Sequence, residues 1–473
     1  MKYDVVVIGG GTAGTYAALS ARITYPEKSV TLIRREKTAI APLGLHYLLR
    51  GLTSTGADCA LDSFLKEKDI HVVIGEVTDR DGPIVNLRDG RHISFSKLVL
   101  ALGAVPIEPN IPGLDQPGVY LLNKSPDLLA RLRKAVRTAR DVLIVGGGDV
   151  GVELADELAK AGKQVTIVET KSHLLPSLLD PEFAHAIKEQ LEKQGAQVVL
   201  GTGVKALVGR KSLSGADLAD GRWVTAELAI VAAGFRPCVQ LAQKMGLRVD
   251  APYGIVVDEY LRTSDPDIFA AGDCTTRHGC SSSELRSEML VSTAMVQGRL
   301  AGSNLFSINT ARSFQCSVSP FSTKVGDMAV GVVGLTENQA RKLGLGFVVG
   351  CSGTVDCYPH ELPGATEMTV KLLFARDSHQ LLGAQMLGHD LVGECVNMLS
   401  VLIQKKTTNM ELDTLQIATH PLLTPSPLGH AIINATVDAA RSWYPPQIRR
   451  DNRGSSPGDY LSQPAPRDRS STT

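Results

Sequence analysis

The chain has 473 residues, of which 43% are hydrophobic and 45 are glycine, and this predicts a globular protein of two or three domains. Its 49 lysines and arginines balance its 49 aspartates and glutamates, so no charged field favours nucleic acid, and small-molecule partners are expected. No apolar run reaches the roughly 18 residues of a membrane span. The start "MKYDVVVIGG" enters a strand directly, and the eight cysteines form no CxxC pair, so we expect a cytoplasmic protein with reduced thiols and no metal site.

The first predicted element is a buried strand at residues 3–8, "YDVVVI", followed by Gly9, Gly11 and Gly14 in the spacing G-x-G-x-x-G and then by a helix. The first glycine allows a tight turn, the second lets the backbone approach a pyrophosphate, and the third packs the helix against the strand. The helix N-terminus supplies free N–H groups for the phosphates. Taken alone, the motif fits either a dinucleotide site or a turn that serves only packing.

The next predicted strand, "SVTLI", ends at Arg34, where an acidic residue is expected to accept hydrogen bonds from a ribose. Arg34 either stacks on an adenine or is solvated. Glu36 is a candidate to replace the missing acid.

The glycine turn of Gly9, Gly11 and Gly14 is called the first cradle. A second cradle, with Gly146, Gly148 and Gly151 in the same spacing, follows the strand "VLIV" at residues 142–145. The strand "QVTIVE" that follows the helix ends at Glu169, 23 residues after Gly146, where a carboxylate can accept hydrogen bonds from both ribose hydroxyls. Two complete strand–turn–helix units predict two bound dinucleotides.

Three further segments are each predicted to end a strand in a turn of small residues: "KLVLALGAVP" (97–106), "ELAIVAAGFRP" (227–237) and "TSDPDIFAAGD" (263–273). Asp273 ends the last of them. Its carboxylate can hydrogen-bond a polyol such as the ribityl chain of a flavin, or it can cap the following helix, and the two roles are compatible.

Together these motifs resemble the pyridine nucleotide–disulfide oxidoreductase family, flavoproteins that bind two dinucleotides, and the resemblance covers roughly residues 1–445. It implies an α/β fold class with two Rossmann-like dinucleotide-binding domains, one inserted in the other, and a C-terminal α+β dimerisation domain. The implied limits are 1–108 and 249–315 for the FAD-binding domain, 109–248 for the NAD(P)-binding domain and 316–445 for the dimerisation domain. Residues 446–473, rich in Pro, Ser and charge, are expected to be a disordered tail.

The resemblance also implies the cofactors and their contacts. FAD is expected on the first cradle with Asp273, and NAD(P)H on the second with Glu169 and Gly234. Because Glu169 would repel a 2′-phosphate, NADH is the preferred donor. Glu153, in "GVELA", matches a family glutamate near the flavin edge where hydride arrives, so it is a candidate positioning residue; the alternative is an ordinary helix-surface glutamate.

The segment "APLGLHY" matches the context "V-P-C-G-I-P-Y" of the coenzyme A disulfide reductases and related NADH oxidases, and it places Leu43 where they carry a redox cysteine. Leucine cannot act as a thiolate relay. His46 and Tyr47 are candidates to line an acceptor pocket, although His46 also fits a structural role. Four other cysteines are better interpreted as apolar fillers or loop thiols than as displaced redox groups: Cys274, Cys280, Cys351 and Cys357.

His420, in "ATHPLLTPSP", matches the family's His-Pro, which completes the site of the partner subunit in a homodimer. The usual acidic partner downstream is absent, so a structural role and a catalytic role remain open.

The predicted function is that of an FAD-dependent NAD(P)H oxidoreductase that passes electrons directly to an acceptor, either a small molecule or a redox protein. Two alternatives are a disulfide or persulfide reductase with a displaced cysteine, and a non-catalytic, nucleotide-responsive flavoprotein subunit.

Overall fold

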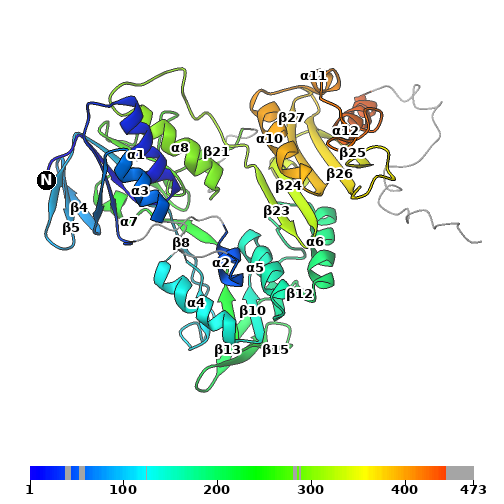
Figure 1. The fold of residues 1–473 in the computed structure, drawn as a ribbon, viewed down its shortest axis with the longest axis horizontal. Coiled ribbons are helices and arrows are strands. Elements are labelled where there is room, and N and C mark those ends of the chain that lie inside the picture. Colours follow the sequence, from blue (N-terminus) through cyan, green and yellow to red (C-terminus); the bar gives the residue numbers. More distant parts are fainter. Residues whose placement is uncertain (38–43, 53–58, 124, 281–284, 287–288, 444–473) are drawn as a thin grey trace, which may run out of the picture. The chain divides into compact units, whose positions relative to one another are not determined.

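The computed structural model describes residues 1–37, 44–52, 59–123, 125–280, 285–286 and 289–443 (Figure 1). Leu43 and the predicted tail, 446–473, lie outside these residues. The chain forms two compact units, Met1–Ser319 and Pro320–Thr473.

A parallel sheet of five strands organises the first unit. Its strands are mostly apolar because both faces of the sheet are covered. Helices pack on one face, and an antiparallel sheet within residues 77–94 packs on the other. The order is β20-β7-β1-β2-β3. The strands are β1 (Val5–Ile8), β2 (Val30–Arg34), β3 (Ile70–Ile74), β7 (Lys97–Leu100) and β20 (Ile268–Ala270).

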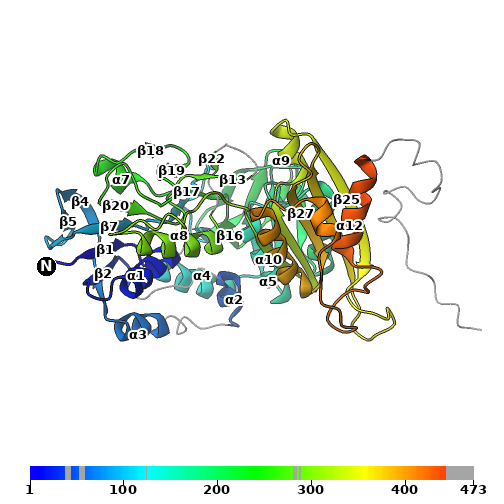
Figure 2. The ribbon, with the colours of Figure 1, turned by 90° about the horizontal axis from the view of Figure 1, so that it is seen from above.

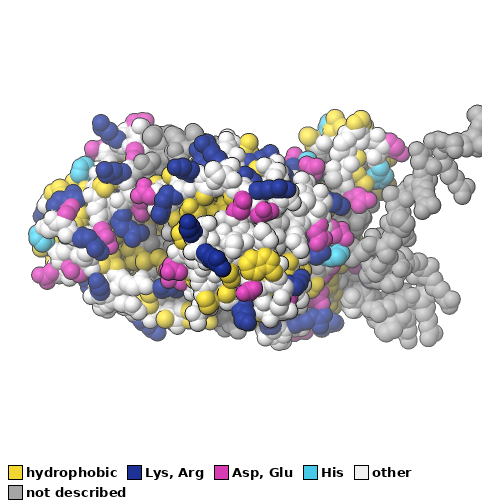
Figure 3. Space-filling view, turned by 90° about the horizontal axis from the view of Figure 1, so that it is seen from below, with side chains coloured by type: hydrophobic (Ala, Val, Ile, Leu, Met, Phe, Trp, Pro, Cys, Tyr) yellow, Lys and Arg dark blue, Asp and Glu magenta, His cyan; other side chains and the backbone are white. Residues whose placement is uncertain are grey.

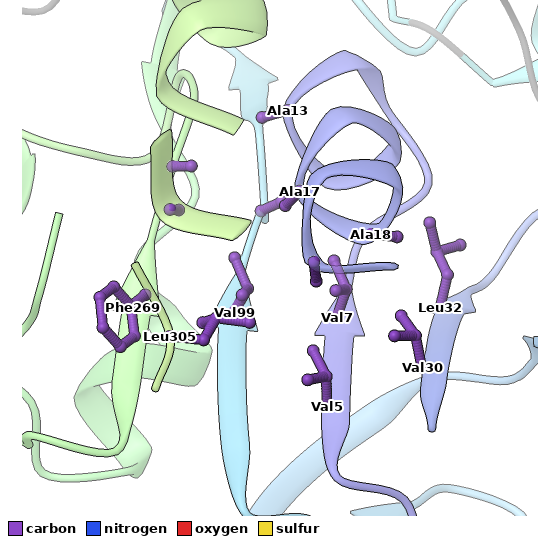
Figure 4. Packing of buried hydrophobic residues seen from close by; sticks show 14 of the residues in the cluster. Val5, Val7, Ala13, Ala17, Ala18, Val30, Leu32, Val99, Phe269 and Leu305 are labelled. Atoms are coloured by element: carbon purple, nitrogen blue, oxygen red, sulfur yellow. The ribbon is translucent and has the colours of Figure 1, made fainter. Parts of the chain in front are cut away.

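Two helices, α1 (Thr12–Thr24) and α8 (Val291–Ser303), lie side by side against this sheet (Figure 2). Their contact depends on small residues. A Cβ at Gly298 would lie 2.3 Å from the carbonyl oxygen of Ala13, and one at Gly302 would lie 2.2 Å from that of Ala17. Figure 4 shows the side chains of β1, β2 and β7 packed below α1. The glycines therefore hold α8 directly against the helix that follows the first glycine turn.

A second parallel sheet, in the order β12-β11-β10-β16-β9, is built from residues between β7 and β20, so it is inserted into the first. Its strands are β9 (Val119–Leu121), β10 (Asp141–Val145), β11 (Gln164–Glu169), β12 (Gln197–Leu200) and β16 (Leu228–Val231). Its helices are α4 (Pro126–Thr138), α5 (Asp149–Lys160) and α6 (Pro181–Lys193). The chain leaves and re-enters the first sheet through the paired strands β8 (Ala104–Pro106) and β17 (Phe235–Pro237).

Shorter elements complete the first unit. The helices are α2 (Leu45–Arg50), α3 (Cys59–Glu67) and α7 (Gln240–Lys244). Two antiparallel sheets of three strands contain β4 (Val77–Asp81), β5 (Ile84–Leu87), β6 (His92–Ser94), β13 (Val204–Gly209), β14 (Leu213–Leu218) and β15 (Trp223–Thr225). Two short pairs are β18 (Val249–Asp250) with β19 (Gly254–Ile255), and β21 (Arg277–His278) with β22 (Leu285–Arg286).

The second unit is an antiparallel sheet with helices, in the order β23-β24-β27-β26-β25. Its strands are β23 (Phe321–Val325), β24 (Met328–Gly334), β25 (Phe347–Val355), β26 (Glu367–Ala375) and β27 (Leu381–Gly388). Its helices are α9 (Glu337–Lys342), α10 (Leu391–Gln404), α11 (Asn409–Asp413) and α12 (Ala431–Ala440), followed by a 3-10 turn at Arg441–Trp443. The three large sheets agree with the predicted fold class, whereas the exact domain limits stay a prediction.

Basic and acidic side chains are interspersed on the molecular surface seen in Figure 3, as the balanced charge of the sequence predicts. Within the described residues, none of the helices has the length and apolar character needed to cross a bilayer.

Candidate active site at two glycine cradles

The glycines of the first cradle have the separate roles that their spacing predicts. Gly9 has a φ of +117°, and a Cβ there would lie 2.0 Å from the carbonyl oxygen of Ala101. A Cβ at Gly14 would lie 1.9 Å from the carbonyl oxygen of Gly9. Gly11, in contrast, has no neighbouring protein atom within 4 Å of its Cβ position. Two glycines thus permit packing, and the middle one leaves the backbone open to a ligand.

A cavity of about 420 Å³ lies over this cradle, a volume within the range of cofactor pockets. The glycine turn, Glu36, Asp273 and the start of α8 all line it. The structure therefore brings the predicted Asp273 and Glu36 to one cavity, although they are far apart in the sequence. It also adds lining residues that the sequence did not indicate, such as Glu76, Lys244 and Met289.

Arg34 is neither solvated nor free, which corrects one of the two predicted alternatives. Its side chain is 2% exposed and makes a bidentate ion pair with Asp62 of α3, with both N–O distances at 2.6 Å. It also donates to the carbonyl oxygens of Glu36 and Lys37. A Cβ at Gly10 would lie 2.6 Å from Arg34 Cδ, so the aliphatic part of Arg34 backs the glycine turn. Stacking on an adenine stays a prediction.

Gln297, fully buried in α8, fixes the turn that presents Asp273, and the sequence analysis missed it. Its Oε1 accepts the N–H of Gly272 at 2.8 Å and the hydroxyl of Thr275 at 3.1 Å. The available signal was an amide in the middle of a helix made largely of small residues.

The second cradle repeats the geometry of the first. Gly146 has a φ of +114° with a Cβ position 2.3 Å from the carbonyl oxygen of Ala232, and the Cβ position of Gly151 is 2.0 Å from the carbonyl oxygen of Gly146. Gly148 again has no protein atom within 4 Å. The predicted Gly234, with a φ of +101°, lies in the turn after β16, the strand beside β10.

Glu169 ends β11 as predicted, and the protein already uses most of its acceptor capacity. Oε2 accepts the N–H of Gly147 at 2.7 Å, and Oε1 accepts the N–H of Lys171 at 2.8 Å and the hydroxyl of Thr170 at 3.0 Å. A carboxylate offers about four acceptor positions, so about one is left for a ribose hydroxyl. These bonds hold the carboxylate in a fixed orientation beside the glycine turn.

Helix α2, which follows the segment of Leu43, lies against α5 of the second cradle, and two pairs of polar side chains join the two helices. His46 Nδ1 lies 3.1 Å from Glu153 Oε2, and Arg50 Nη1 lies 2.9 Å from Glu157 Oε2. The paired residues are four apart on each helix, so both pairs lie on one face of α2 and one face of α5. The structure thus brings together His46 and Glu153, which the sequence analysis had singled out separately.

The side chains of this pair are 15% and 24% exposed, so both are largely shielded from solvent. Tyr47 is 40% exposed, and its ring contacts the His46 imidazole edge-on with a centroid separation of 4.1 Å. Gly44, with a φ of 85°, precedes α2 and allows the sharp entry into the helix.

Lys160 compensates the acidic groups at the end of α5. Burial acts to lower the pKa of Lys160, but the hydrogen bond and the charge of Asp156, together with Glu157, outweigh it and raise the pKa above its ordinary value. Lys160 therefore stays charged and, with Arg50, balances two carboxylates that are almost fully buried.

The cysteines differ from the expectation of reduced thiols. Cys280 forms a disulfide with Cys316, so it is neither a filler nor a free loop thiol, and it does not pair with Cys274. Cys274 is fully buried and donates to the carbonyl oxygen of Ala271, which agrees with the filler interpretation. The other two cysteines considered differ in burial, since Cys351 is exposed and Cys357 is buried. Sequence could not indicate the partner of Cys280 because disulfide connectivity has no local signature.

His420 is exposed on the second unit, and its Nδ1 accepts the N–H of Leu422 at 3.2 Å. Three exposed leucines lie beside it in the sequence: Leu422 (63%), Leu423 (63%) and Leu428 (93%). Exposed apolar side chains of this kind are candidates for a protein interface.

Two family descriptions match the chain. Residues 3–298 match the pyridine nucleotide-disulphide oxidoreductase family, and residues 321–428 match its dimerisation domain.

Several known proteins are similar over most of their length. An NADH oxidase of Methanocaldococcus jannaschii is 28% identical over 88% of this chain and 94% of its own. An NAD(P)H coenzyme A polysulfide/persulfide reductase of Pyrococcus horikoshii is 30% identical over 86% of this chain and 92% of its own. Among solved structures, the water-forming NADH oxidase from Lactobacillus brevis bound to NADH has a TM-score of 0.85 and 26% identity, and it covers 93% of this chain and 98% of its own.

Proposed function

Because this chain belongs to the pyridine nucleotide-disulphide oxidoreductase family, we propose that it carries out the family's electron transfer without a cysteine at the usual position. It is an FAD-dependent NAD(P)H oxidoreductase, the class to which its relatives' names point. The observation that carries the proposal is the His46–Glu153 pair, which joins α5 to α2, the helix that follows Leu43. By its sequence context, Leu43 matches the position at which related reductases carry a cysteine.

Both cradles support the cofactors. Open backbone at Gly11 and Gly148 leaves room for a pyrophosphate. Asp273 lines the first cavity and Glu169 ends the strand beside the second glycine turn, which supports their proposed roles as acceptors for ribityl and ribose hydroxyls. Bound FAD supplies the chemistry of accepting hydride from NAD(P)H and giving electrons to a second substrate. The chain's own residues bind and orient the two dinucleotides and exclude water.

His46 is proposed to hold a proton for the acceptor. Glu153 Oε2 faces Nδ1 of the imidazole, which fixes the proton on that nitrogen and leaves Nε2 as the nitrogen that exchanges a proton with substrate. An acceptor that takes up protons with its electrons, such as oxygen or a quinone, needs such a group. A one-electron redox protein does not. The pair therefore favours oxygen or a quinone as the acceptor class.

Anaerobic titration with NADH tests the absence of a thiol relay. We expect reduction to end at about one NADH per flavin, since one flavin accepts one hydride, and no long-wavelength thiolate-to-flavin band should develop. Leu43→Cys should introduce such a band. Uptake of about two NADH per flavin by the wild type would contradict the proposal.

The role of His46 is tested by the variant His46→Gln, which keeps a donor toward Glu153 but cannot supply a proton. Loss of a proton-transfer group typically slows the affected step by about 10²-fold or more. We expect this loss in reoxidation by oxygen or a quinone, with little change in reduction by NADH or in reoxidation by a ferredoxin-like protein. The matched control is His185→Gln, which removes the exposed His185–Glu189 pair on α6. Equal slowing of both half-reactions would refute a proton-transfer role.

A disulfide or persulfide reductase is the second candidate, because two relatives carry such names and because this chain has a disulfide. It requires Cys280 and Cys316 to take the electrons. The discriminating result is uptake of four electrons per flavin by the wild type, lost together with turnover in Cys280→Ser.

The dimerisation domain supports a homodimer, and the exposed leucines beside His420 support this segment as part of its interface. In that assembly His420 would complete the flavin site of the partner subunit.

A further inference from the structure

The turn at residues 271–275 brings Asp273 to the FAD cavity, and its conformation depends on a glycine. Gly272 has a φ of +84°, and a Cβ there would lie 2.7 Å from the Cβ of Ala13, near the start of α1. Ala271, Gly272 and Asp273 all line the cavity. A change in the conformation of this turn therefore changes the wall that faces the cofactor.

Helix α8 supports this turn through one face. Val291 and Ala294, near the start of the helix, line the cavity, and Gln297 follows Ala294 by three residues. Residues three apart are neighbours on a helix surface, so Gln297 lies one turn deeper on the face that meets the cavity. Because the next residue, Gly298, approaches the backbone of Ala13 closely, the depth of Gln297 is fixed relative to α1.

The buried amide of Gln297 is hydrogen-bonded through its oxygen. Oε1 accepts the N–H of Gly272 at 2.8 Å and lies 3.1 Å from the hydroxyl oxygen of Thr275, whereas Nε2 has no hydrogen-bond partner among the described residues. The N–H of Gly272 can donate only to the amide oxygen, so the orientation of the amide is determined. A buried amide N–H without a partner is unfavourable, and an apolar side chain of similar size would avoid it. What glutamine adds at this position is therefore an acceptor for the turn.

We propose that Gln297 is a positioning residue for FAD, which holds the turn of Gly272 and Asp273 in its binding conformation before the cofactor arrives. When a site is already ordered, less of the binding free energy is lost in ordering it. Without the acceptor, the N–H of Gly272 loses its hydrogen bond to α8, and the turn relaxes when FAD is absent. This role rests on FAD binding at the first cradle, as proposed above, and is independent of the electron acceptor.

The experiment compares the variant Gln297→Met with the wild type, each as the FAD-loaded full chain. Methionine has a similar shape but offers no acceptor of comparable strength to the N–H of Gly272. Flavin fluorescence after serial dilution gives the dissociation constant of FAD, which should rise about tenfold, equivalent to about 1.4 kcal/mol. A wild type that carries no FAD would contradict the proposed function itself. A variant that holds FAD as tightly as the wild type overturns only the role of Gln297.

The matched control is Asn304→Leu, at the C-terminal end of the same helix. Asn304 is also a fully buried amide, its Oδ1 accepts the N–H of Asn309 at 3.1 Å, and its Nδ2 has no partner among the described residues. This bond lies at the opposite end of α8 from the cavity. The control should lower the thermal unfolding temperature and leave the dissociation constant of FAD unchanged. Equal weakening of FAD binding by both variants would show a general loss of stability and refute the proposal.

Two further measurements separate positioning from stability. FAD should raise the unfolding temperature of Gln297→Met less than that of the wild type, because a ligand stabilises a protein according to its affinity. Thr275→Val removes the hydroxyl beside Oε1 and should also weaken FAD binding. The double variant should raise the dissociation constant by less than the product of the two single effects, since both residues support one turn. An effect equal to that product would show that Gln297 acts elsewhere.

Discussion

Alanine substitutions at the open glycines should separate the two dinucleotide sites. Gly148 has a φ of −73° and a ψ of −174°, a conformation that alanine adopts without strain, and its Cβ position has no protein atom within 4 Å. Two small effects on folding oppose each other. A more restricted unfolded chain stabilises the variant by about 0.4–1 kcal/mol, whereas alanine is poorer than glycine at a helix N-cap by about 0.5–1 kcal/mol. The free energy of unfolding should therefore hardly change.

The added methyl instead fills space that a dinucleotide backbone needs. Overpacking by one methyl costs about 1–3 kcal/mol, which corresponds to about a 5- to 140-fold rise in the dissociation constant at 1.4 kcal/mol per tenfold. Gly148→Ala should lose this much affinity for NADH and keep its FAD. Gly11→Ala, with a φ of −78° and equally open space, should purify with little FAD and bind NADH normally.

Flavin absorbance per chain measures the FAD that each variant retains, and titration with NADH measures its dissociation constant. Thermal unfolding measures the stability of both variants. Gly393→Ala is the control, because Gly393 is equally open but lies in α10 of the second unit. Gly146→Ala should fail to fold well, since its Cβ would lie 2.3 Å from a backbone oxygen. If Gly148→Ala binds NADH within about twofold of the wild type, the second cradle does not hold the pyrophosphate as argued.

Three further predictions concern cofactors and assembly. NADH should give a higher kcat/KM than NADPH because Glu169 repels a 2′-phosphate, and Glu169→Ser should narrow the difference; a wild-type preference for NADPH would overturn the assignment. Acid precipitation should release all the flavin, and colour left on the precipitate would indicate a covalent link. Sedimentation should give a homodimer that Leu428→Asp dissociates, because Leu428 is 93% exposed in the single chain; a fully active monomer would remove His420 from the site.

The parts of the site that follow local rules could be predicted from the sequence. The spacing of each glycine triplet predicts which positions meet backbone and which stay open. The third glycine meets the first glycine of its own turn, and the first glycine meets the end of the neighbouring parallel strand, at Ala101 or Ala232. The structure places Gly11 and Gly148 in open space accordingly. Asp273 and Glu169 also lie where the strand ends predict.

Contacts between distant segments could not be predicted. The environment of Arg34, at the end of β2, follows no local rule because its partner, Asp62, belongs to helix α3. His46 and Glu153 belong to different helices far apart in the sequence and meet only through the packing of α2 on α5. Neither pair leaves a periodicity or motif in the sequence, since each depends on how whole elements are arranged.

The strand order β20-β7-β1-β2-β3 has a consequence for the order of events during synthesis. The strand that completes this sheet, β20, begins at Ile268, and 167 residues separate it from its neighbour β7, which ends at Leu100. At roughly 5–20 residues per second, the ribosome needs roughly 10–30 s to supply it. The inserted sheet is complete earlier, at Val231. The inserted sheet is therefore complete before the sheet that surrounds it in the sequence, and the segment that carries Asp273 reaches the first cradle only after the second cradle has its whole sheet.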